Sequence, residues 1–467
     1  MISSGVAEEV YEPRFTYNGF QYVLVSGLIQ SLEPDDIVQC VLSTDFNEIG
    51  SFVSSDPILN RLVGAATRSY RANFTVGVPT DCPHREKNGW TGDASIASEF
   101  AQYVFENTPA YEKWLKDVVD AQRTDGNLPG VVPTAGWGYK WGNGPAWDSA
   151  LPVIAWNLWN YRDDRKILDE IYPALKRYLD YTAQKSDEIG LVRHGLGDWI
   201  PVRQEHVPPV EFISSCYYYQ ALRIASGIAV VKGLDAESKD WKAAAGRTRD
   251  GLRKKFRKKD GVWANGGQTA QGMALAFGLV SDMECQAVVR QLVASVEREG
   301  CHIDTGVIGA KHVFRALSRV GRADLAFKML TNPSSPSMAD WVRKNGTTLW
   351  EDWQNGFSRN HVMFGDFLGW AYQYLAGIRL PEESGSCSAI LIASERAFRK
   401  VVFAPCVVDE LNHVSAVVET PFGSYESSWT RENGIVKYRF GVPPGGSAVI
   451  RILGHPDETV CSGIYER

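Results

Sequence analysis

The sequence predicts a mainly α-helical fold, a closed ring of helical hairpins, followed by a small antiparallel β-sandwich and preceded by a few strands. Apolar residues recur every three or four positions from Asp56 to about Leu375, which is the period of amphipathic helices. After Gly377 the apolar runs are short and separated by turn residues, as in antiparallel sheets. Residues 14–31 are rich in Phe, Tyr and Val, which favours strands there as well.

The N-terminal strands come first in the chain. Residues 14–31 read RFTYNGFQYVLVSGLIQS, and Asn18-Gly19 is a strong turn signal between two strands. A strand pair that begins so close to Met1 has little sheet to join. We therefore expect residues 1–50 to be remnant strands of an upstream β-domain, and the chain to be N-terminally truncated.

Residues 51–378 are expected to form the helical domain. Its first helix carries apolar residues at Ile58, Leu59, Leu62, Val63 and Ala66. Further helices are expected to begin near Ala94, Pro109, Trp147, Arg165, Phe212, Glu237, Thr269, Ser281, Gly306, Ala323 and Asn360. This gives about twelve helices, and no repeat of fixed period supports a solenoid, so hairpins closed into a ring fit best.

Residues 379–467 are expected to form the β-sandwich. Short apolar runs occupy residues 389–392, 400–403, 414–418, 435–440 and 448–453. Turn sequences separate them, such as Glu432-Asn433-Gly434. Several short strands at such spacing are typical of a small sandwich.

The composition excludes several classes of protein. Of 467 residues, 44% are hydrophobic and 22% charged, and a net charge of −6 leaves no basic domain for nucleic acid. No apolar run is long enough to span a membrane, and the first residues lack a signal-peptide pattern. We expect a soluble protein with no nucleic-acid or membrane partner. Its compartment, periplasmic or cytoplasmic, and its oligomeric state stay open.

The eight cysteines are dispersed, with no Cys-x-x-Cys pair. Such spacing predicts neither a zinc site nor a disulfide framework. No phosphate-binding loop, nucleophile elbow or metalloprotease motif occurs in the chain either. We therefore expect free thiols, no metal and no cofactor.

Tryptophan is distributed unevenly, since 14 of the 15 Trp residues lie between Trp90 and Trp370. This predicts either a large aromatic core or a cleft for a flat ligand with an apolar face, such as a sugar. In predicted loops, acids adjoin two of them, in Trp147-Asp148 and Asp198-Trp199. Carboxylates that bind hydroxyls beside indoles that stack on a sugar ring favour a carbohydrate cleft.

Two segments concentrate the acids that a glycosidase needs. Residues 81–93 read DCPHREKNGWTGD, and residues 347–353 read TTLWEDW, with Asn360-His361 shortly after them. Hydrolysis of a glycosidic bond takes two carboxyl groups, an acid for the leaving oxygen and a base or nucleophile. Each residue also has a structural alternative: Asp93 as a helix cap, Glu86 in a surface ion pair, and His361 as a structural histidine.

With these motifs the sequence resembles the bacterial α-L-rhamnosidases of glycoside hydrolase family 78, from about Phe15 to Gly454. The usual family loop reads approximately DCPQRDERLGWTGD, so this chain is one residue shorter. Matching its GWTGD half without a break places Glu86 on the family's general acid, whereas matching from Asp81 would place Lys87 there. The TTLWEDW segment matches the family's TTIWERWD, which puts Glu351 in the general-base position.

The resemblance implies an (α/α)6 barrel flanked by β-sandwich domains. It also implies residues around the rhamnose, namely Asp81, Trp90, Asp93, Trp147, Trp199 and His361. The stretch from Gln354 to Arg359 is a shortened loop compared with the family pattern.

The activity implied is removal of terminal α-L-rhamnose from glycans or glycosides by an inverting mechanism. Glu86 is expected to protonate the leaving oxygen and Glu351 to activate water, with the two carboxyl groups roughly 6.5–9.5 Å apart. One alternative is another glycosidase of the same barrel class, such as an unsaturated uronide hydrolase, whose cleft should present Arg or Lys. The other is a carbohydrate-binding protein without catalysis, which the shortened acid loop would permit.

Overall fold

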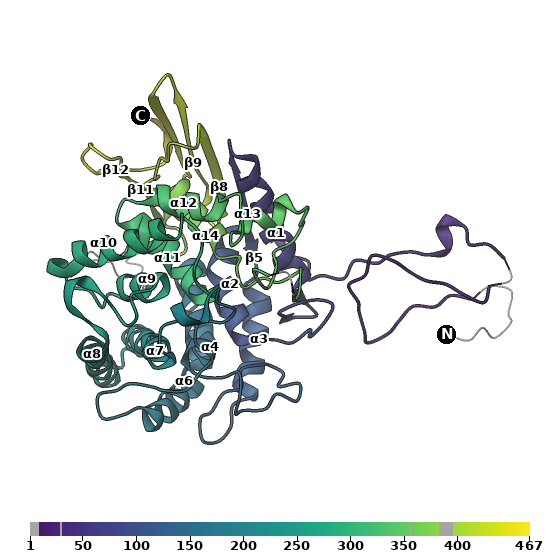
Figure 1. Ribbon diagram of the computed structural model, residues 1–467, viewed down its shortest axis with the longest axis horizontal. Coiled ribbons are helices and arrows are strands. Elements are labelled where there is room, and N and C mark those ends of the chain that lie inside the picture. Colours follow the sequence, from purple (N-terminus) through teal and green to yellow (C-terminus); the bar gives the residue numbers. More distant parts are fainter. Residues whose placement is uncertain (1–8, 29, 355, 383–395) are drawn as a thin grey trace.

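The computed structural model describes residues 9–28, 30–354, 356–382 and 396–467. A helical domain forms the body of the molecule, a β-sandwich lies above it at the C-terminus, and residues 9–46 project to one side (Figure 1). We call residues 9–46 the N-terminal arm. The three parts follow the predicted order of strands, helices and sandwich, although the arm lacks the strands.

Fourteen α-helical segments occur in the described ranges. They are α1 (Pro57–Ala72), α2 (Thr91–Val104), α3 (Thr108–Asp120), α4 (Pro145–Asp148), α5 (Ala150–Arg162), α6 (Arg165–Lys185), α7 (Val210–Lys232), α8 (Asp235–Phe256), α9 (Gln268–Ala276), α10 (Asp282–Arg298), α11 (Val307–Arg319), α12 (Ala323–Thr331), α13 (Met338–Arg343) and α14 (Phe367–Trp370). A single π-helical turn, Ala371–Leu375, continues α14. The helix predicted to begin at Asn360 thus starts seven residues later, and α13 was not predicted.

Burial alternates from helix to helix along the chain. The helices α2, α5, α7, α9, α11 and α14 are buried over most of their circumference. The helices α1, α3, α6, α8 and α10 between them bury one stripe each and expose the opposite face. The first set therefore forms an inner ring, and the second set, together with α12 between α11 and α14, forms an outer ring of six helices, which confirms the predicted (α/α)6 barrel.

The sandwich consists of two packed sheets. The strands of the first, in spatial order, are β13 (Gly463–Glu466), β10 (Ile435–Val442), β9 (Gly423–Glu432), β8 (His413–Thr420) and β2 (Gly50–Ser54). Those of the second are β12 (Glu458–Val460), β11 (Ser447–Ile450), β7 (Lys400–Phe403) and β6 (Ile378–Arg379). Phe403 and Phe440 stack between the sheets with ring centroids 4.8 Å apart. The predicted sandwich is thus present, but it is not antiparallel throughout, because β7 and β11 pair in parallel. The run at 389–392 lies outside the described residues.

One strand of the sandwich comes from the other end of the chain. β2 precedes the first barrel helix, yet it pairs antiparallel with β8, with Gly50 opposite Val418 and Ser54 opposite Val414. The sequence analysis assigned most of this strand to the barrel. Two short two-stranded ribbons also occur among the described residues, β1 (Asn47–Glu48) with β5 (Phe105–Glu106) and β3 (Phe74–Thr75) with β4 (Val78–Pro79).

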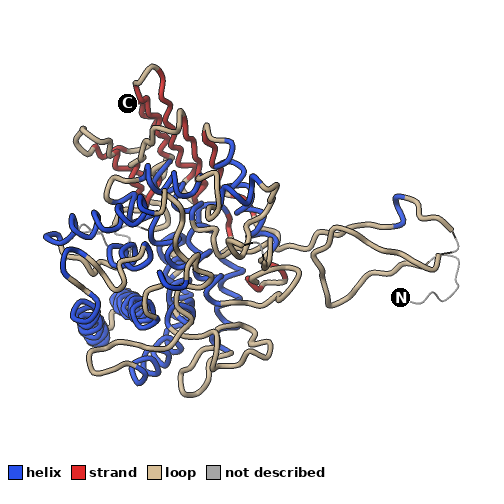
Figure 2. Tube along the Cα trace, viewed as in Figure 1, coloured by secondary structure: helices blue, strands red, loops and turns tan. Residues whose placement is uncertain are grey.

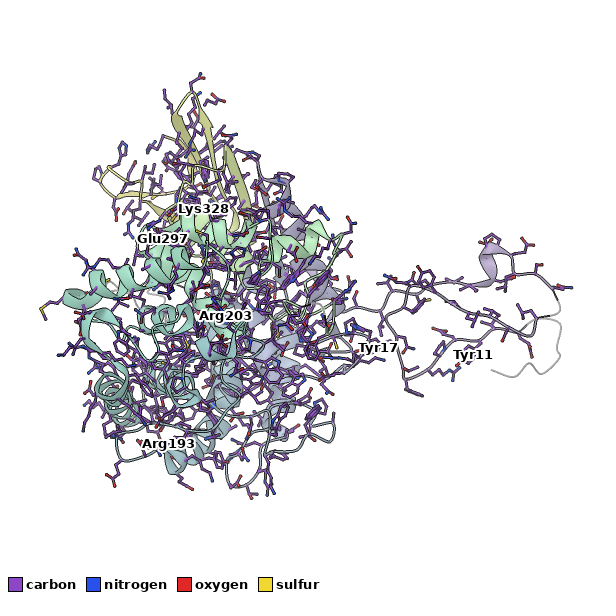
Figure 3. All side chains as sticks on the ribbon, in the orientation of Figure 1. Tyr11, Tyr17, Arg193, Arg203, Glu297 and Lys328 are labelled. Atoms are coloured by element: carbon purple, nitrogen blue, oxygen red, sulfur yellow. The ribbon has the colours of Figure 1, made fainter. Side chains whose placement is uncertain are left out.

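The N-terminal arm corrects one prediction. Its described residues contain a single 3-10 turn, Pro34–Asp36, and no strand over residues 14–31 (Figure 2). A strand is stable only when its N–H and C=O groups pair with a neighbour, and the described residues supply none here. Tyr17 lies where the arm meets the barrel, whereas Tyr11 lies farther out (Figure 3).

The barrel and the sandwich share an interface. Lys328 of α12 pairs with Glu410 at 3.3 Å, and its place beneath the sandwich can be followed in Figure 3. The indole Nε1 of Trp429 donates to the carbonyl of Leu375 at 2.9 Å. None of the helices in the described ranges combines the length and apolarity that a bilayer crossing requires.

Candidate active site

A pocket of about 160 Å³ opens among the loops of the barrel. Its lining residues are Asp81, Arg85, Glu86, Trp90, Asp93, Trp137, Trp141, Trp147, Leu196, Trp199, Ile200, Glu351, Phe357, His361 and Met363. The eight site residues proposed from the sequence are all among them. Segments far apart in the chain therefore meet at one place.

The loop that carries Glu86 is held closed at its base. Asp81 and Asn88 exchange hydrogen bonds, because the N–H of Asp81 donates to the carbonyl of Asn88 at 2.9 Å and the N–H of Asn88 donates to Asp81 Oδ1 at 2.8 Å. The indole Nε1 of Trp90 donates to Glu86 Oε2 at 3.0 Å. The Glu86 carboxylate is thereby directed into the pocket by the indole that follows it in the sequence.

Glu351 stands on the opposite loop and is almost fully buried, with 7% of its side chain exposed. Its Oε2 accepts a hydrogen bond from the N–H of Ser358 at 2.9 Å, and its own N–H donates to the Ser358 carbonyl at 2.8 Å. Ser358, which lies in the stretch that is shorter than the family pattern, thus holds the carboxylate.

Arg85 bridges the two carboxylates. Its Nη2 lies 3.0 Å from Glu86 Oε1 and 2.8 Å from Glu351 Oε2, and its guanidinium lies 5.4 Å from the centre of the Phe357 ring. The nearest oxygens of Glu86 and Glu351 are therefore closer than the roughly 6.5–9.5 Å expected for an inverting pair. The surface ion pair that was the alternative for Glu86 is formed, but it reaches the second acid as well.

His361 and Asp93 form a buried ion pair on the pocket floor. His361 Nε2 lies 3.2 Å from Asp93 Oδ1, and Nδ1 lies 3.7 Å from Glu351 Oε2. Burial alone would lower the pKa of His361, but its contacts with Asp93 and Cys82 and the charge of Glu351 raise that pKa well above its usual value. Asp93 makes no side-chain cap bond, and the N-cap of α2 is Trp90, so the helix-cap alternative is wrong.

Asp81 and Cys82 share a proton beside this pair. Cys82 Sγ lies 3.0 Å from Asp81 Oδ2. Burial raises the pKa of Asp81 to about 9. Burial would also raise the pKa of the Cys82 thiol, but its hydrogen bonds with His361, Asp81 and the Glu86 backbone lower that pKa to about 6. At neutral pH the proton therefore resides on Asp81, and a thiolate faces the imidazolium.

The two acidic–aromatic pairs found in the sequence, Trp147-Asp148 and Asp198-Trp199, contribute to the site in different ways. The Trp147 ring lies against Gly92, where a Cβ would come within 2.5 Å of it, so the GWTGD glycine makes room for this wall of the pocket. Asp198 accepts hydrogen bonds from the N–H groups of Gly306, Ile308 and Gly309. Asp198 thus caps α11 and fixes the neighbouring Trp199, while the indole itself faces the pocket.

Seven lining residues were not proposed from the sequence: the apolar Leu196, Ile200 and Met363, and also Arg85, Trp137, Trp141 and Phe357. The Gly-rich stretch GWGYKWG carries two of them and was a usable signal, because Trp in such a loop has no helix face to bury. In contrast, Trp350 and Trp353, which flank Glu351 and Asp352 in the sequence, are packed against Trp341. Trp353 reaches only a neighbouring groove of about 720 Å³.

Two groups of residues have the composition of metal ligands. Ligand atoms of Asp81, Cys82 and His361 lie within 4.8 Å of one another, but a protonated imidazole has no lone pair for a metal. In the second group, His206, Glu299 and Asp304, Arg203 pairs with Asp304 at 2.7 Å and also pairs with Glu299. In the conformation described, a proton occupies a ligand atom of the first group and Arg203 occupies the carboxylates of the second.

Comparison with known families gives a match over nearly the whole chain. Residues 47–375 match the bacterial alpha-L-rhamnosidase 6 hairpin glycosidase domain, residues 390–464 match the C-terminal domain of these proteins, and residues 1–43 match their concanavalin-like domain.

Similar individual proteins are named alpha-L-rhamnosidases. One from Streptomyces avermitilis is 31% identical over 97% of this chain and 43% of its own length, and one from Formosa agariphila is 29% identical over 95% and 48%. The chain thus spans about half the length of these curated relatives.

Solved structures agree with the sequence matches. That of an alpha-L-rhamnosidase from Dictyoglumus thermophilum has a TM-score of 0.88 at 28% identity, covering 98% of this chain and 54% of that one. The Streptomyces avermitilis enzyme complexed with L-rhamnose has a TM-score of 0.83 at 27% identity, covering 91% and 42%.

Proposed function

The chain belongs to the bacterial alpha-L-rhamnosidase family of six-hairpin glycosidases, and we propose that it removes terminal α-L-rhamnose from glycans or glycosides by hydrolysis. One observation supports this function most directly. Glu86 and Glu351 come from loops far apart in the chain and face each other across one pocket, linked by Arg85. Two opposed carboxyl groups are what hydrolysis of a glycosidic bond requires.

In the proposed reaction Glu86 is protonated and gives its proton to the leaving glycosidic oxygen. Glu351, as a carboxylate, removes a proton from a water that attacks the anomeric carbon from the opposite face. The products are β-L-rhamnose and the free alcohol of the leaving group, so the anomeric configuration is inverted. Glu351 is oriented for this role by the Ser358 N–H at 2.9 Å.

Arg85 occupies the space that the glycosidic bond must fill. We propose that substrate binding displaces its guanidinium, since the Arg85 side chain is 38% exposed and lies against Phe357 at the pocket edge. The two carboxylates then separate to the spacing that admits a water. Asp81, Asp93 and His361, which form the polar floor, are proposed to bind the rhamnose hydroxyls, with Trp90, Trp147 and Trp199 against its ring.

The first experiment measures rhamnose release from an aryl α-L-rhamnoside and from plant-type glycans. We expect Glu86→Gln and Glu351→Gln each to lower kcat/KM about 10²–10⁴-fold, because each removes one proton transfer. Glu86→Gln should lose much less on a substrate with a highly acidic leaving group, which needs no protonation. Glu112→Gln, which removes a carboxylate on α3 far from the pocket, is the matched control.

The stereochemistry has its own test. Proton NMR of the earliest product should show β-L-rhamnose before mutarotation. Early α-L-rhamnose would overturn the inverting mechanism and, with the close approach of Glu86 and Glu351, would favour a covalent intermediate instead.

A uronide hydrolase remains the alternative that one observation favours. Arg85 is the single arginine or lysine among the described residues that line the pocket, and such a side chain is what a uronide carboxylate would need. Arg85 is already paired with two acids, which argues for a neutral sugar. Turnover of an unsaturated uronide disaccharide in preference to the aryl rhamnoside would reverse this assignment.

A further inference from the structure

Two tryptophans differ from all the others in the chain. All fifteen Trp lie among the described residues, and Trp137 and Trp141 are the two with large exposed areas, at 42% and 44%. Their rings stack on each other, with centroids 5.0 Å apart and an interplanar angle of 25°. Exposed indoles are costly to leave in water, so an adjacent exposed pair indicates a binding surface.

This indole pair adjoins the proposed acid. The ring centroid of Trp90 lies 5.5 Å from that of Trp137 and 5.7 Å from that of Trp141, and Trp90 itself donates to Glu86. The group that leaves with the glycosidic oxygen must lie beside the acid that protonates it. The polar atoms proposed to bind rhamnose are on the floor of the pocket, at Asp81, Asp93 and His361.

We propose that Trp137 and Trp141 form the leaving-group subsite, and that it takes the apolar face of an uncharged ring attached to the glycosidic oxygen. This inference rests on the proposed function and specifies its substrate class. An aromatic aglycone and a neutral pyranose both present such a face, and the experiment below separates them. Arg85 is the one arginine or lysine among the described residues that line the pocket, and Glu86 and Glu351 balance its charge, so this lining has no excess positive charge for a charged leaving group.

The neighbouring 720 Å³ groove is a less suitable place for this group. It is lined by Asp352, Trp353 and Gln354, which follow the proposed base, whereas neither Glu86 nor Trp90 is among its lining residues. A leaving group in that groove would be separated from the proton donor. The indole pair is the surface that continues from the acid.

The loop that carries the pair is fixed before any ligand binds. Tyr139, between the two indoles in sequence, donates its hydroxyl to the carbonyl of Ala121 at 2.7 Å and lies under the guanidinium of Arg123. Its own carbonyl accepts from the side-chain amides of Asn127 and Asn143, each at 3.2 Å. Such anchoring reduces the entropy lost when a ring stacks on the pair.

The test compares substrates with and without a leaving-group ring. Trp137→Ala and Trp141→Ala are assayed on 4-nitrophenyl α-L-rhamnoside and on α-L-rhamnosyl fluoride, which releases only fluoride. We expect kcat/KM to fall at least about tenfold on the aryl substrate, mainly through KM. On the fluoride, and in competitive inhibition by rhamnose, the change should stay within about twofold, because no ring contacts the pair.

Controls separate this role from a general loss of packing. Trp241→Ala removes a half-buried indole from α8, away from the pocket, and should change neither substrate's turnover. Tyr139→Phe, which loses the anchor to Ala121, should reduce turnover of the aryl substrate alone. Equal losses on both substrates, or no loss on either, would overturn the subsite.

The ring class is settled by two disaccharides. Rhamnosyl glucoside carries a neutral pyranose and rhamnosyl galacturonide a charged one, and the wild type should prefer the first. Preference for the galacturonide would overturn the uncharged class. If the wild type hydrolyses the aryl rhamnoside but its Trp variants are unaffected, only this inference fails. If the wild type hydrolyses none of the substrates, the proposed hydrolase function fails and this inference with it.

Discussion

Asp81 and Cys82 have pKa values that folding shifts in opposite directions. Their effects on the pH dependence of the free energy of unfolding can therefore cancel. Burial raises the pKa of Asp81 to about 9, so the folded state holds a proton that the unfolded state has lost. Hydrogen bonding lowers the pKa of Cys82 to about 6, so the folded state lacks a proton that the unfolded thiol retains. Between pH 6 and 9 folding therefore moves one proton from sulfur to oxygen without net uptake.

Removing the Cys82 thiol should reveal the contribution of Asp81 to the pH dependence of the free energy of unfolding. In Cys82→Ala the folded state binds one proton more than the unfolded state, so stability falls as pH rises through this range. We expect the free energy of unfolding, relative to wild type, to decrease by up to about 1.4 kcal/mol per pH unit from pH 6 to 9. Urea titrations at several pH values measure it.

Cys461→Ala is the matched control, because Cys461 is exposed and lies in the sandwich. The free energy of unfolding of Cys461→Ala should differ from that of the wild type by the same amount at every pH in this range. A Cys82→Ala difference that is equally constant would mean that the two groups do not exchange a proton on folding.

At the scale of residues, linear motifs were enough to propose Glu86 and Glu351 as the acids, but not to predict the groups between them. Glu86 could be proposed because GWTGD fixes the register of the loop, and all eight proposed residues line one pocket. The position of Arg85 could not be assigned, since its bridge depends on how close residues 86 and 351 approach in space. Phe357 was missed for the same reason.

At the scale of elements, the contact between α2 and α4 depends on a missing side chain. Gly92 of α2 lies against Trp147 of α4, and a Cβ there would come within 2.5 Å of the indole. Gly92→Ala should therefore displace Trp147, lower the free energy of unfolding by about 1–3 kcal/mol and raise KM. Chemical denaturation and steady-state kinetics on one preparation test both effects.

Gly246→Ala is the control for the same substitution in a helix. Nothing lies within 4 Å of a Cβ placed at Gly246 in α8, so alanine should stabilise the chain by roughly 0.5–1 kcal/mol. If Gly92→Ala were equally stabilising, the close contact with Trp147 would not constrain the pocket.

Helices were easier to predict than strands, because the sequence signals of a helix lie within a few residues of one another, whereas a strand depends on a partner elsewhere in the chain. The start of α1 has Asp56 accepting from the Leu59 N–H at 2.7 Å, and α10 has a capping box at Ser281, so both signals lie within four residues. In β9 the inward residues include Ser427 among the aromatics, which weakens the apolar pattern. The arm had the composition of strands but no partner among the described residues.

At the scale of the whole molecule, the barrel and the sandwich are joined by buried hydrogen bonds. Trp429 of β9 donates to the carbonyl of Leu375, and Ser427 donates to that of Ala376 at 2.5 Å. Trp429→Phe keeps most of the ring but leaves the Leu375 carbonyl without this donor. We expect the free energy of unfolding to fall by about 1–3 kcal/mol. In chemical denaturation the barrel and the sandwich should still unfold together in a single transition.

Trp241→Phe on the barrel surface is the matched control and should cost less. If Trp429→Phe split the unfolding into two separate transitions, the barrel and sandwich would be less tightly coupled than these contacts imply.

The pairing of β2 with β8 also affects folding during synthesis, because β2 is translated long before its partner strand. Gly50–Ser54 leaves the ribosome early, but its partner residues 414–418 come after the entire barrel. At about 5–20 residues per second, the strand waits roughly 20–70 s for its neighbour. During that interval Phe52, later buried, is exposed on an open strand edge. The nascent chain is therefore most open to aggregation or chaperone binding until residues 414–418 appear.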